Sequence, residues 1–203
     1  MKKSLVYLLL LLAISACKQA TKSESTEPVV LWTPYNDSAE VAANADHEKQ
    51  RMRYKFIQSK VLDKNEVFMP LYDESSQFSS DKYEMMKPLV LEQDIPTLQG
   101  HILSGTFSYE DLVLFYLHRI YKYELPNETT LNTIIALNPK VLEEARSLDK
   151  TGEGHHPIYG MPILLKDNIG AKAMHTTAGA IALIDNTTDD AFIVERLRSK
   201  GAL

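Results

Sequence analysis

Lys166 comes at the end of an apolar segment, residues 158–165, that is expected to form a strand inside a sheet. Lysine is rarely buried without a partner or a function. Asp167 and Asn168 follow it directly, and their side chains could hold an ammonium group. The small-residue loop at residues 176–179 comes soon afterwards and lets the backbone approach closely. A catalytic lysine would be presented in this way, so the segment points to an enzyme.

Each of these residues also has a purely structural interpretation. A lysine that follows a strand is usually solvated at the end of the sheet. Asp167 and Asn168 could position the lysine or hold the following loop, or they could simply end the strand and cap a turn. Thr176, Thr177 and Gly179 could line a site, or they could form a tight turn that needs small side chains. On the residues alone, both interpretations stay open.

The N-terminus predicts export. Two lysines precede an apolar run at residues 5–14, which is too short to cross a bilayer that needs about 20 residues. Residues 1–16 are therefore predicted to be a signal peptide. Residues 14–17, Ile-Ser-Ala-Cys, resemble a bacterial lipobox, which implies lipidation of Cys17; the alternative is a plain cleaved signal with an incidental cysteine. We expect residues 17–28 to be a tether, and the protein to be lipid-anchored in the cell envelope of a bacterium, on the periplasmic side or the surface.

Composition narrows the classes of function. The net charge is −5, and no cluster of lysine and arginine suggests a nucleic-acid partner. None of the six histidines stands in a spacing typical of metal ligands, so neither a metal nor another cofactor is expected. Cys17 is the only cysteine, which excludes a disulfide within the chain.

Helical and strand-like patterns alternate along the chain. Residues 29–93 are predicted to form a helical arm, with helical character at residues 38–65 and a loop at residues 66–81. The β-prone segments are residues 131–137 and 158–166. Four further helices are predicted: residues 95–103, stopped by Gly105; a helix from the N-cap Ser108 to before Pro126; residues 138–150; and a helix from Asp189 or Asp190 to Gly201. This order is typical of an α/β fold. Residues 202–203 resemble the beginning of another strand, from which we expect the chain to be the N-terminal fragment of a longer protein.

Residues 95–203 resemble the amidase signature family of amide hydrolases. The most specific match is the segment at residues 159–169, Tyr-Gly-Met-Pro-Ile-Leu-Leu-Lys-Asp-Asn-Ile, followed by Thr-Thr-Ala-Gly at residues 176–179. The resemblance implies the N-terminal part of the amidase-signature fold, a mixed sheet flanked by helices, with residues 94–203 forming the truncated amidase domain. It also implies a Ser–cis-Ser–Lys triad in which Lys166 is the lysine and both serines lie beyond Leu203. The family often has a serine where this chain has Ala180, so no hydroxyl contact is expected from that position.

What the resemblance implies is hydrolysis of the C–N bond of a small-molecule or peptide carboxamide through a serine acyl-enzyme, without a cofactor. The fragment alone is expected to be inactive. Two other functions stay open: an envelope lipoprotein that only binds small molecules on this scaffold, and one subunit of a tRNA-dependent amidotransferase. The export signal argues against the second, because aminoacyl-tRNA is cytoplasmic.

Overall fold

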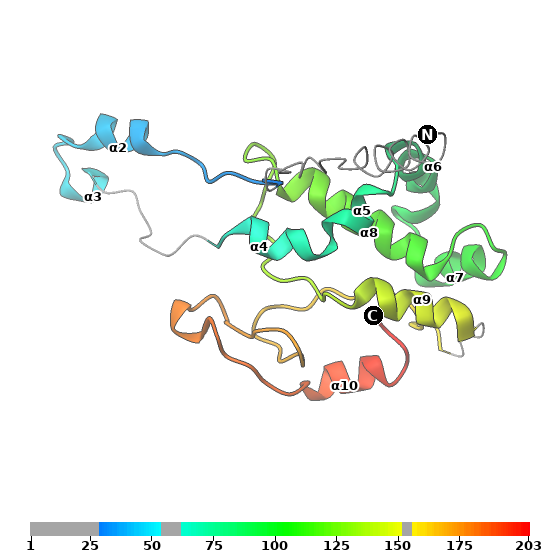
Figure 1. Cartoon of the computed structure of the whole chain (residues 1–203). Helices are drawn as coiled ribbons and strands as arrows, with labels where there is room; N and C mark the ends of the chain where they lie inside the picture. The colour runs from blue at the N-terminus through cyan, green and yellow to red at the C-terminus, as the bar shows by residue number, and fades with distance from the viewer. Residues whose placement is uncertain (1–28, 54–61, 152–155) are drawn as a thin grey trace, which may run out of the picture.

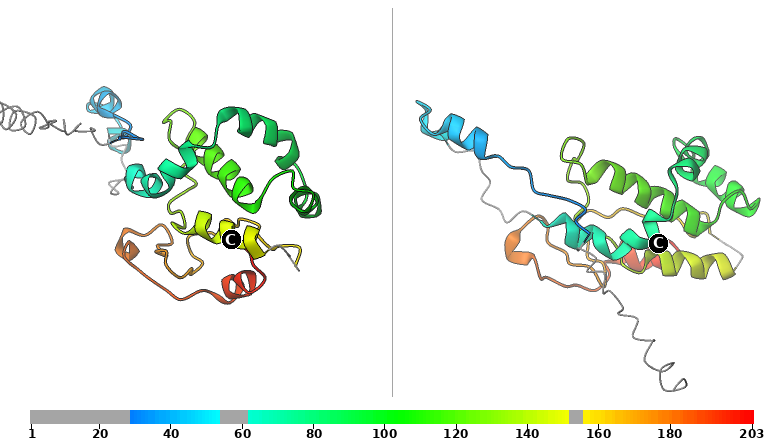
Figure 2. Two further views of the ribbon diagram at one scale, coloured as in Figure 1. Left: turned by 45° about the vertical axis from the view of Figure 1, so that its right-hand side comes forward. Right: turned by 45° about the horizontal axis from the view of Figure 1, so that its top comes forward.

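The computed structural model describes residues 29–53, 62–151 and 156–203. In Figure 1, α2 and α3 lie apart from the other helices, and α9 lies between α8 and the segment that carries α10; Figure 2 shows the same arrangement from two other sides. In chain order, the helices of the described residues are α2 (Ser38–Asn44), α3 (Gln50–Arg53), α4 (Lys64–Phe68), the 3-10 helix η1 (Met69–Leu71), α5 (Tyr72–Ser76), α6 (Ser80–Val90), α7 (Ile95–Leu103), α8 (Tyr109–Glu124), α9 (Val141–Thr151), the 3-10 helix η2 (Ile181–Leu183) and α10 (Phe192–Arg198).

Local signals fix the ends of the long helices. Ser108 caps α8: its hydroxyl accepts from the Asp111 N–H at 3.0 Å, and the Asp111 carboxylate accepts from the Ser108 N–H, a capping box. The end of α7 is a Schellman motif, in which Gly105 adopts a φ of 72° and the Thr106 N–H donates to the His101 carbonyl oxygen at 2.9 Å. The predicted start at Ser108 and the predicted stop at Gly105 are confirmed.

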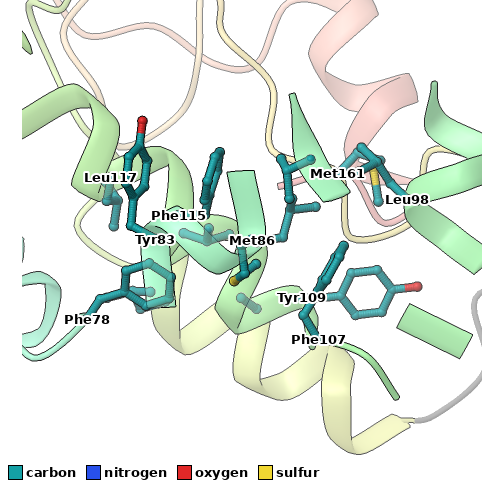
Figure 3. Close-up of a cluster of buried hydrophobic side chains, with 14 of the residues drawn as sticks. Phe78, Tyr83, Met86, Leu98, Phe107, Tyr109, Phe115, Leu117 and Met161 are labelled. Carbon is teal, nitrogen blue, oxygen red and sulfur yellow. The ribbon is translucent and has the colours of Figure 1, made fainter. Parts of the chain in front are cut away.

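One hydrophobic core joins the predicted arm to the region after residue 94. Figure 3 shows side chains of α6, α7, α8 and the segment near Met161 gathered in one cluster. Tyr83 of α6 and Phe115 of α8 are fully buried and stack with ring centroids 4.9 Å apart. Met86 and Leu112 are buried beside them. The later part of the helical arm, which includes α6, is therefore packed onto the scaffold that carries Lys166.

The predicted loop at residues 66–81 is wrong, because most of it is helical. Asp63 caps α4 by accepting from the Asn65 N–H at 2.8 Å, and the short helices η1 and α5 follow α4 without a break. Phe68 is fully buried with its ring 5.3 Å from that of Tyr121 in an edge-on contact, and the Tyr121 hydroxyl donates to its carbonyl oxygen. Packing against α8 thus outweighs the proline and serines that suggested a loop.

The expected sheet is present only as single pairings within the described residues. The Leu203 N–H donates to the Met161 carbonyl oxygen at 3.0 Å, and the Ile163 N–H donates to the Leu203 carbonyl oxygen at 2.9 Å. Leu203 thus bonds through its N–H to the residue before Pro162 and through its carbonyl oxygen to the residue after it. This is the hydrogen-bond pattern of two parallel strands. His175 and Thr187 form an isolated antiparallel bridge. Residues 131–137 are not paired as a strand.

Candidate active site

Lys166 stands on an open face of the segment that leads to it. The segment starts at Gly160, whose φ of 69° and whose contact with the Tyr109 ring leave no room for a side chain. Beyond the buried Met161, exposure alternates, and Leu164, with 78% of its surface exposed, lies on the same side as the exposed Lys166. This differs from the expected sheet interior, because no second layer covers this face in the part of the chain described. The Lys166 ammonium makes no hydrogen bond or ion pair with any described residue.

Lys166 lines a groove of about 1020 Å³. Its walls come from α8, the extended residues 131–137, the segment around Lys166 and residues 174–176. Many wall residues are apolar, and Leu131 and Leu164 are 81% and 78% exposed. A groove with apolar walls and one unpartnered cation is the general form of a small-molecule site.

Asp167 holds the loop that follows it. Its Oδ1 accepts from the Thr177 N–H at 3.0 Å, its Oδ2 accepts from the Gly179 N–H at 3.0 Å and from the Thr177 hydroxyl, and its carbonyl oxygen accepts from the Ala178 N–H at 3.0 Å. Partial burial alone would raise the pKa of the Asp167 carboxyl, but the bonds from Thr177 and Gly179 outweigh it and hold the pKa below its usual range. Of the two functional roles considered for Asp167, the geometry corresponds to holding the loop.

Three consecutive N–H groups, those of residues 177–179, thus point at Asp167 rather than into open space. They are not available to stabilise an oxyanion. Ala178 and Gly179 have φ values of 51° and 75°, so the loop is a tight, left-handed turn of the kind that small residues permit. Thr177 and Gly179 build this turn and do not line the groove, whereas Thr176 does.

The structure therefore brings Lys166, Asp167 and Thr176 to one groove. Asn168 is exposed and does not line it. His175 lines the groove beside Thr176.

Sequence reasoning missed a buried ion pair at one end of the groove. Lys64 of α4 and Glu124 of α8 lie 3.6 Å apart, with side chains only 6% and 8% exposed. The Glu124 carboxylate also accepts from the Thr130 hydroxyl at 2.7 Å and from the Thr133 N–H at 3.2 Å. Glu124 and Thr133 line the groove, so this network fixes one of its walls. No local signal could have revealed it, because the partners are 60 residues apart.

The described residues contain no group of three or more His, Cys, Asp or Glu side chains placed to hold a metal. No helix among them is long and apolar enough to cross a membrane. Cys17, the predicted lipidation site, lies outside the described residues.

Comparison with known proteins gives consistent matches. The family model named Amidase matches residues 111–203. A Schizosaccharomyces pombe protein named as an amidase is 37% identical over 114 residues, which cover 54% of this chain and 19% of that protein. One subunit of the glutamyl-tRNA(Gln) amidotransferase from an Exiguobacterium species is 31% identical over 117 residues, which cover 56% of this chain and 23% of that protein.

Solved structures match as well. An amidase family protein from Bacillus anthracis superposes with a TM-score of 0.65 and 32% identity, covering 74% of this chain and 30% of its own. A peptide amidase from Stenotrophomonas maltophilia gives a TM-score of 0.53 and 39% identity, covering 56% of this chain and 24% of its own. The chain spans about a fifth of the curated relatives that it matches. The matches confirm the predicted amidase-type fold and support the resemblance of residues 111–203 to the amidase signature family.

Proposed function

We propose that the protein is an amidase, which hydrolyses the C–N bond of a small-molecule or peptide carboxamide through a serine acyl-enzyme. Lys166 would be the neutral proton carrier, and the two serines would lie in polypeptide beyond Leu203, in a longer protein that contains this chain. The observation that carries the proposal is Lys166 itself. It follows the segment that matches the family, and its ammonium lines an apolar groove without a partner among the described residues.

The chemistry requires the lysine to lose its charge. An ammonium group has no lone pair and cannot accept a proton. Covering the open face of Leu164 and Lys166 with apolar polypeptide would disfavour the charged form. A neutral Lys166 would then take a proton from a bridging serine, which takes one from the nucleophilic serine as its oxygen attacks the carbonyl carbon. The same proton returns to the nitrogen as the C–N bond breaks, so that an amine departs rather than its anion. Water then hydrolyses the ester.

Mutation of Lys166 tests the proposal in the complete protein. Steady-state hydrolysis of an aryl amide should fall by about 10²–10⁴-fold in Lys166→Ala. Lys166→Arg should lose the hydrolytic activity as well, because arginine stays protonated at any working pH. The matched control is Lys172→Arg, an exposed lysine outside the groove, which should keep the wild-type rate. Circular dichroism would verify folding.

An active, folded Lys166→Arg enzyme would contradict the assignment. A wild-type protein that binds carboxamides without turnover would instead favour the binding-only lipoprotein. The rate should also rise with pH as one group loses its proton and then level off, and this rise should vanish with Lys166→Ala.

We also propose that Cys17 is lipidated and anchors the protein to a bacterial membrane. The lipobox-like residues 14–17 and the polar residues 18–28 support it. Growth with a labelled fatty acid should label the wild type but not Cys17→Ser. Equal labelling of the two proteins, or release of the wild type in soluble form, would contradict the anchor.

A further inference from the structure

A second cavity, of about 470 Å³, lies on another side of α8 from the groove and shares no residue with it. It is enclosed by α5, by the start of α6 and by three residues of α8. Hydroxyl-bearing, aromatic and basic side chains line it, and no carboxylate does: Tyr72, Ser75, Ser76, Phe78, Ser79, Ser80, His118, Tyr121 and Lys122.

The N-terminus of α6 forms one wall of this cavity. The 11-residue helix is capped by Ser79, whose hydroxyl accepts from the Lys82 N–H at 3.1 Å. The N–H groups of Ser80 and Asp81, at the start of the first turn, have no acceptor among the described residues. Unpaired N–H groups at the positive end of a helix dipole favour a negative ligand.

Ser75 gives a second, independent indication that this cavity binds a ligand. Ser75 is 4% exposed, and its Oγ has no hydrogen-bond partner among the described residues. It lies beside the Tyr121 phenol, whose pKa is raised to about 12 by burial, with Ser75 opposing the rise. That phenol already donates to the Phe68 carbonyl oxygen. Burying a hydroxyl without a well-aligned hydrogen-bond partner costs free energy. The Ser75 hydroxyl lies next to Tyr121, and both residues line the cavity.

Lys122 supplies the positive charge. Its ammonium lies 3.6 Å from Glu84, a longer contact than the 3.1 Å between Glu84 and Lys87, and 4.9 Å from the Tyr83 ring centre. The ammonium therefore keeps donors to spare. His118 stacks on Tyr83 at 4.7 Å, and burial and the neighbouring Lys122 lower its pKa. The cavity thus combines hydroxyl groups, which can donate or accept, with one ammonium group and no carboxylate.

We propose that this cavity binds a tetrahedral oxyanion, either inorganic phosphate or the phosphate of a monoester. The Ser80 N–H group, the Ser75 hydroxyl and the Lys122 ammonium would donate to its oxygens. A phosphate offers several acceptor oxygens and negative charge, and it matches the unpaired N–H groups and the ammonium better than an uncharged ligand does.

Titration with inorganic phosphate at constant ionic strength tests the site in ¹⁵N-labelled protein. Saturable shifts of the Ser80 and Asp81 amide signals are expected, and Lys122→Gln should weaken binding by about tenfold, the effect of one charge-assisted hydrogen bond. Ser75→Ala should weaken it by a smaller factor. The control is Lys87→Gln, which removes the other partner of Glu84 but no cavity residue, and it should bind as the wild type does.

Glycerol 3-phosphate, titrated in parallel, separates the two sources of the ligand. Tighter binding of the ester would indicate a phosphate monoester, and equal or weaker binding would indicate free phosphate. No saturable shift at Ser80 and Asp81, or equal loss of binding in Lys87→Gln and Lys122→Gln, would overturn the proposal. Weak, unsaturable shifts spread over the surface would mean an adventitious ion only and would overturn it too. A circular dichroism spectrum that matches the wild type's, recorded for each variant, shows that a loss of binding is not a loss of fold.

Discussion

Replacing Glu124 with glutamine should destabilise the protein strongly, because its carboxylate is the centre of a buried network. The Lys64 ammonium is hydrogen-bonded to the Glu124 carbonyl oxygen at 2.6 Å and to the Thr130 hydroxyl at 2.5 Å, and both side chains of the pair are almost fully buried. In Glu124→Gln the ammonium keeps these two acceptors but loses its counter-charge. Breaking a buried pair from one side typically costs about 3–5 kcal/mol, and the two remaining acceptors place the expected loss near the lower limit, about 3 kcal/mol.

The opposite substitution should cost a similar amount. In Lys64→Met the buried carboxylate keeps its donors from Thr130 and Thr133 but loses its counter-charge, so the expected loss is again about 3 kcal/mol. The double variant should be less destabilised than the sum of the two, since the unpaired charge disappears with its partner. The exposed pair Lys87–Glu84 is the control, and Glu84→Gln should change stability little.

Urea unfolding measures these differences with two probes. Far-UV circular dichroism reports the helices, and the fluorescence of Trp32, the only tryptophan, reports the arm next to Lys64, whose ammonium lies 6.0 Å from the indole. If Glu124→Gln costs no more than Glu84→Gln, the network does not hold the arm and the reasoning is refuted.

The pH dependence of stability follows from the same network. Burial alone would raise the pKa of Glu124, but its bonds to Thr133 and Thr130 and the charge of Lys64 hold it below the ordinary value of 4.5. The contribution of Glu124 is therefore complete above that value and is lost as the pH falls through the lower, folded-state pKa. Glu124→Gln should remove this part of the acid destabilisation.

Two further predictions concern the segment around Lys166. Gly160→Ala would place a Cβ 2.1 Å from the Tyr109 ring, at a φ of +69°. The control is Gly179→Ala, where the space around the Cβ is open and the left-handed backbone alone should cost roughly 1–2 kcal/mol of unfolding free energy. Urea unfolding should show a clearly larger loss for Gly160→Ala. A similar loss for both would show that Tyr109 yields. Asp167→Asn should lower the hydrogen-exchange protection factors of the Thr177 and Gly179 amides, measured relative to the intrinsic rate at each pH. Acid should lower them in the wild type as well, because the lowered pKa of Asp167 makes its bonds complete above the ordinary pKa and lost as the pH falls. Unchanged exchange would contradict this role.

The sequence predicted best where the signals are local. The capping residues Asp94 and Ser108 and the stop at Gly105 act within one helical turn, so the bounds of α7 and the start of α8 follow from them. The turns at residues 66–76 could not be read in this way. Their helical form depends on burying Phe68 and Leu71 against α8, which is distant in the sequence.

In the candidate site, too, local signals could be predicted from the sequence and contacts between distant residues could not. The position of Lys166 after an apolar segment, and the turn that follows it, come from neighbouring residues. The exposure of Lys166 could not be predicted, since it depends on which polypeptide covers that face. Likewise, nothing beside Lys64 in the sequence distinguishes it from a solvated lysine, because its burial depends on Glu124.

The pairing of Leu203 with both neighbours of Pro162 has a consequence for association between molecules. Since N–H and C=O groups of successive strand residues point to alternate edges, Pro162 turns its own backbone toward the edge opposite Leu203. Proline carries no N–H, so that edge lacks a donor at its centre. An added strand would lose a ladder bond there, which makes this edge a poor template for aggregation by strand addition.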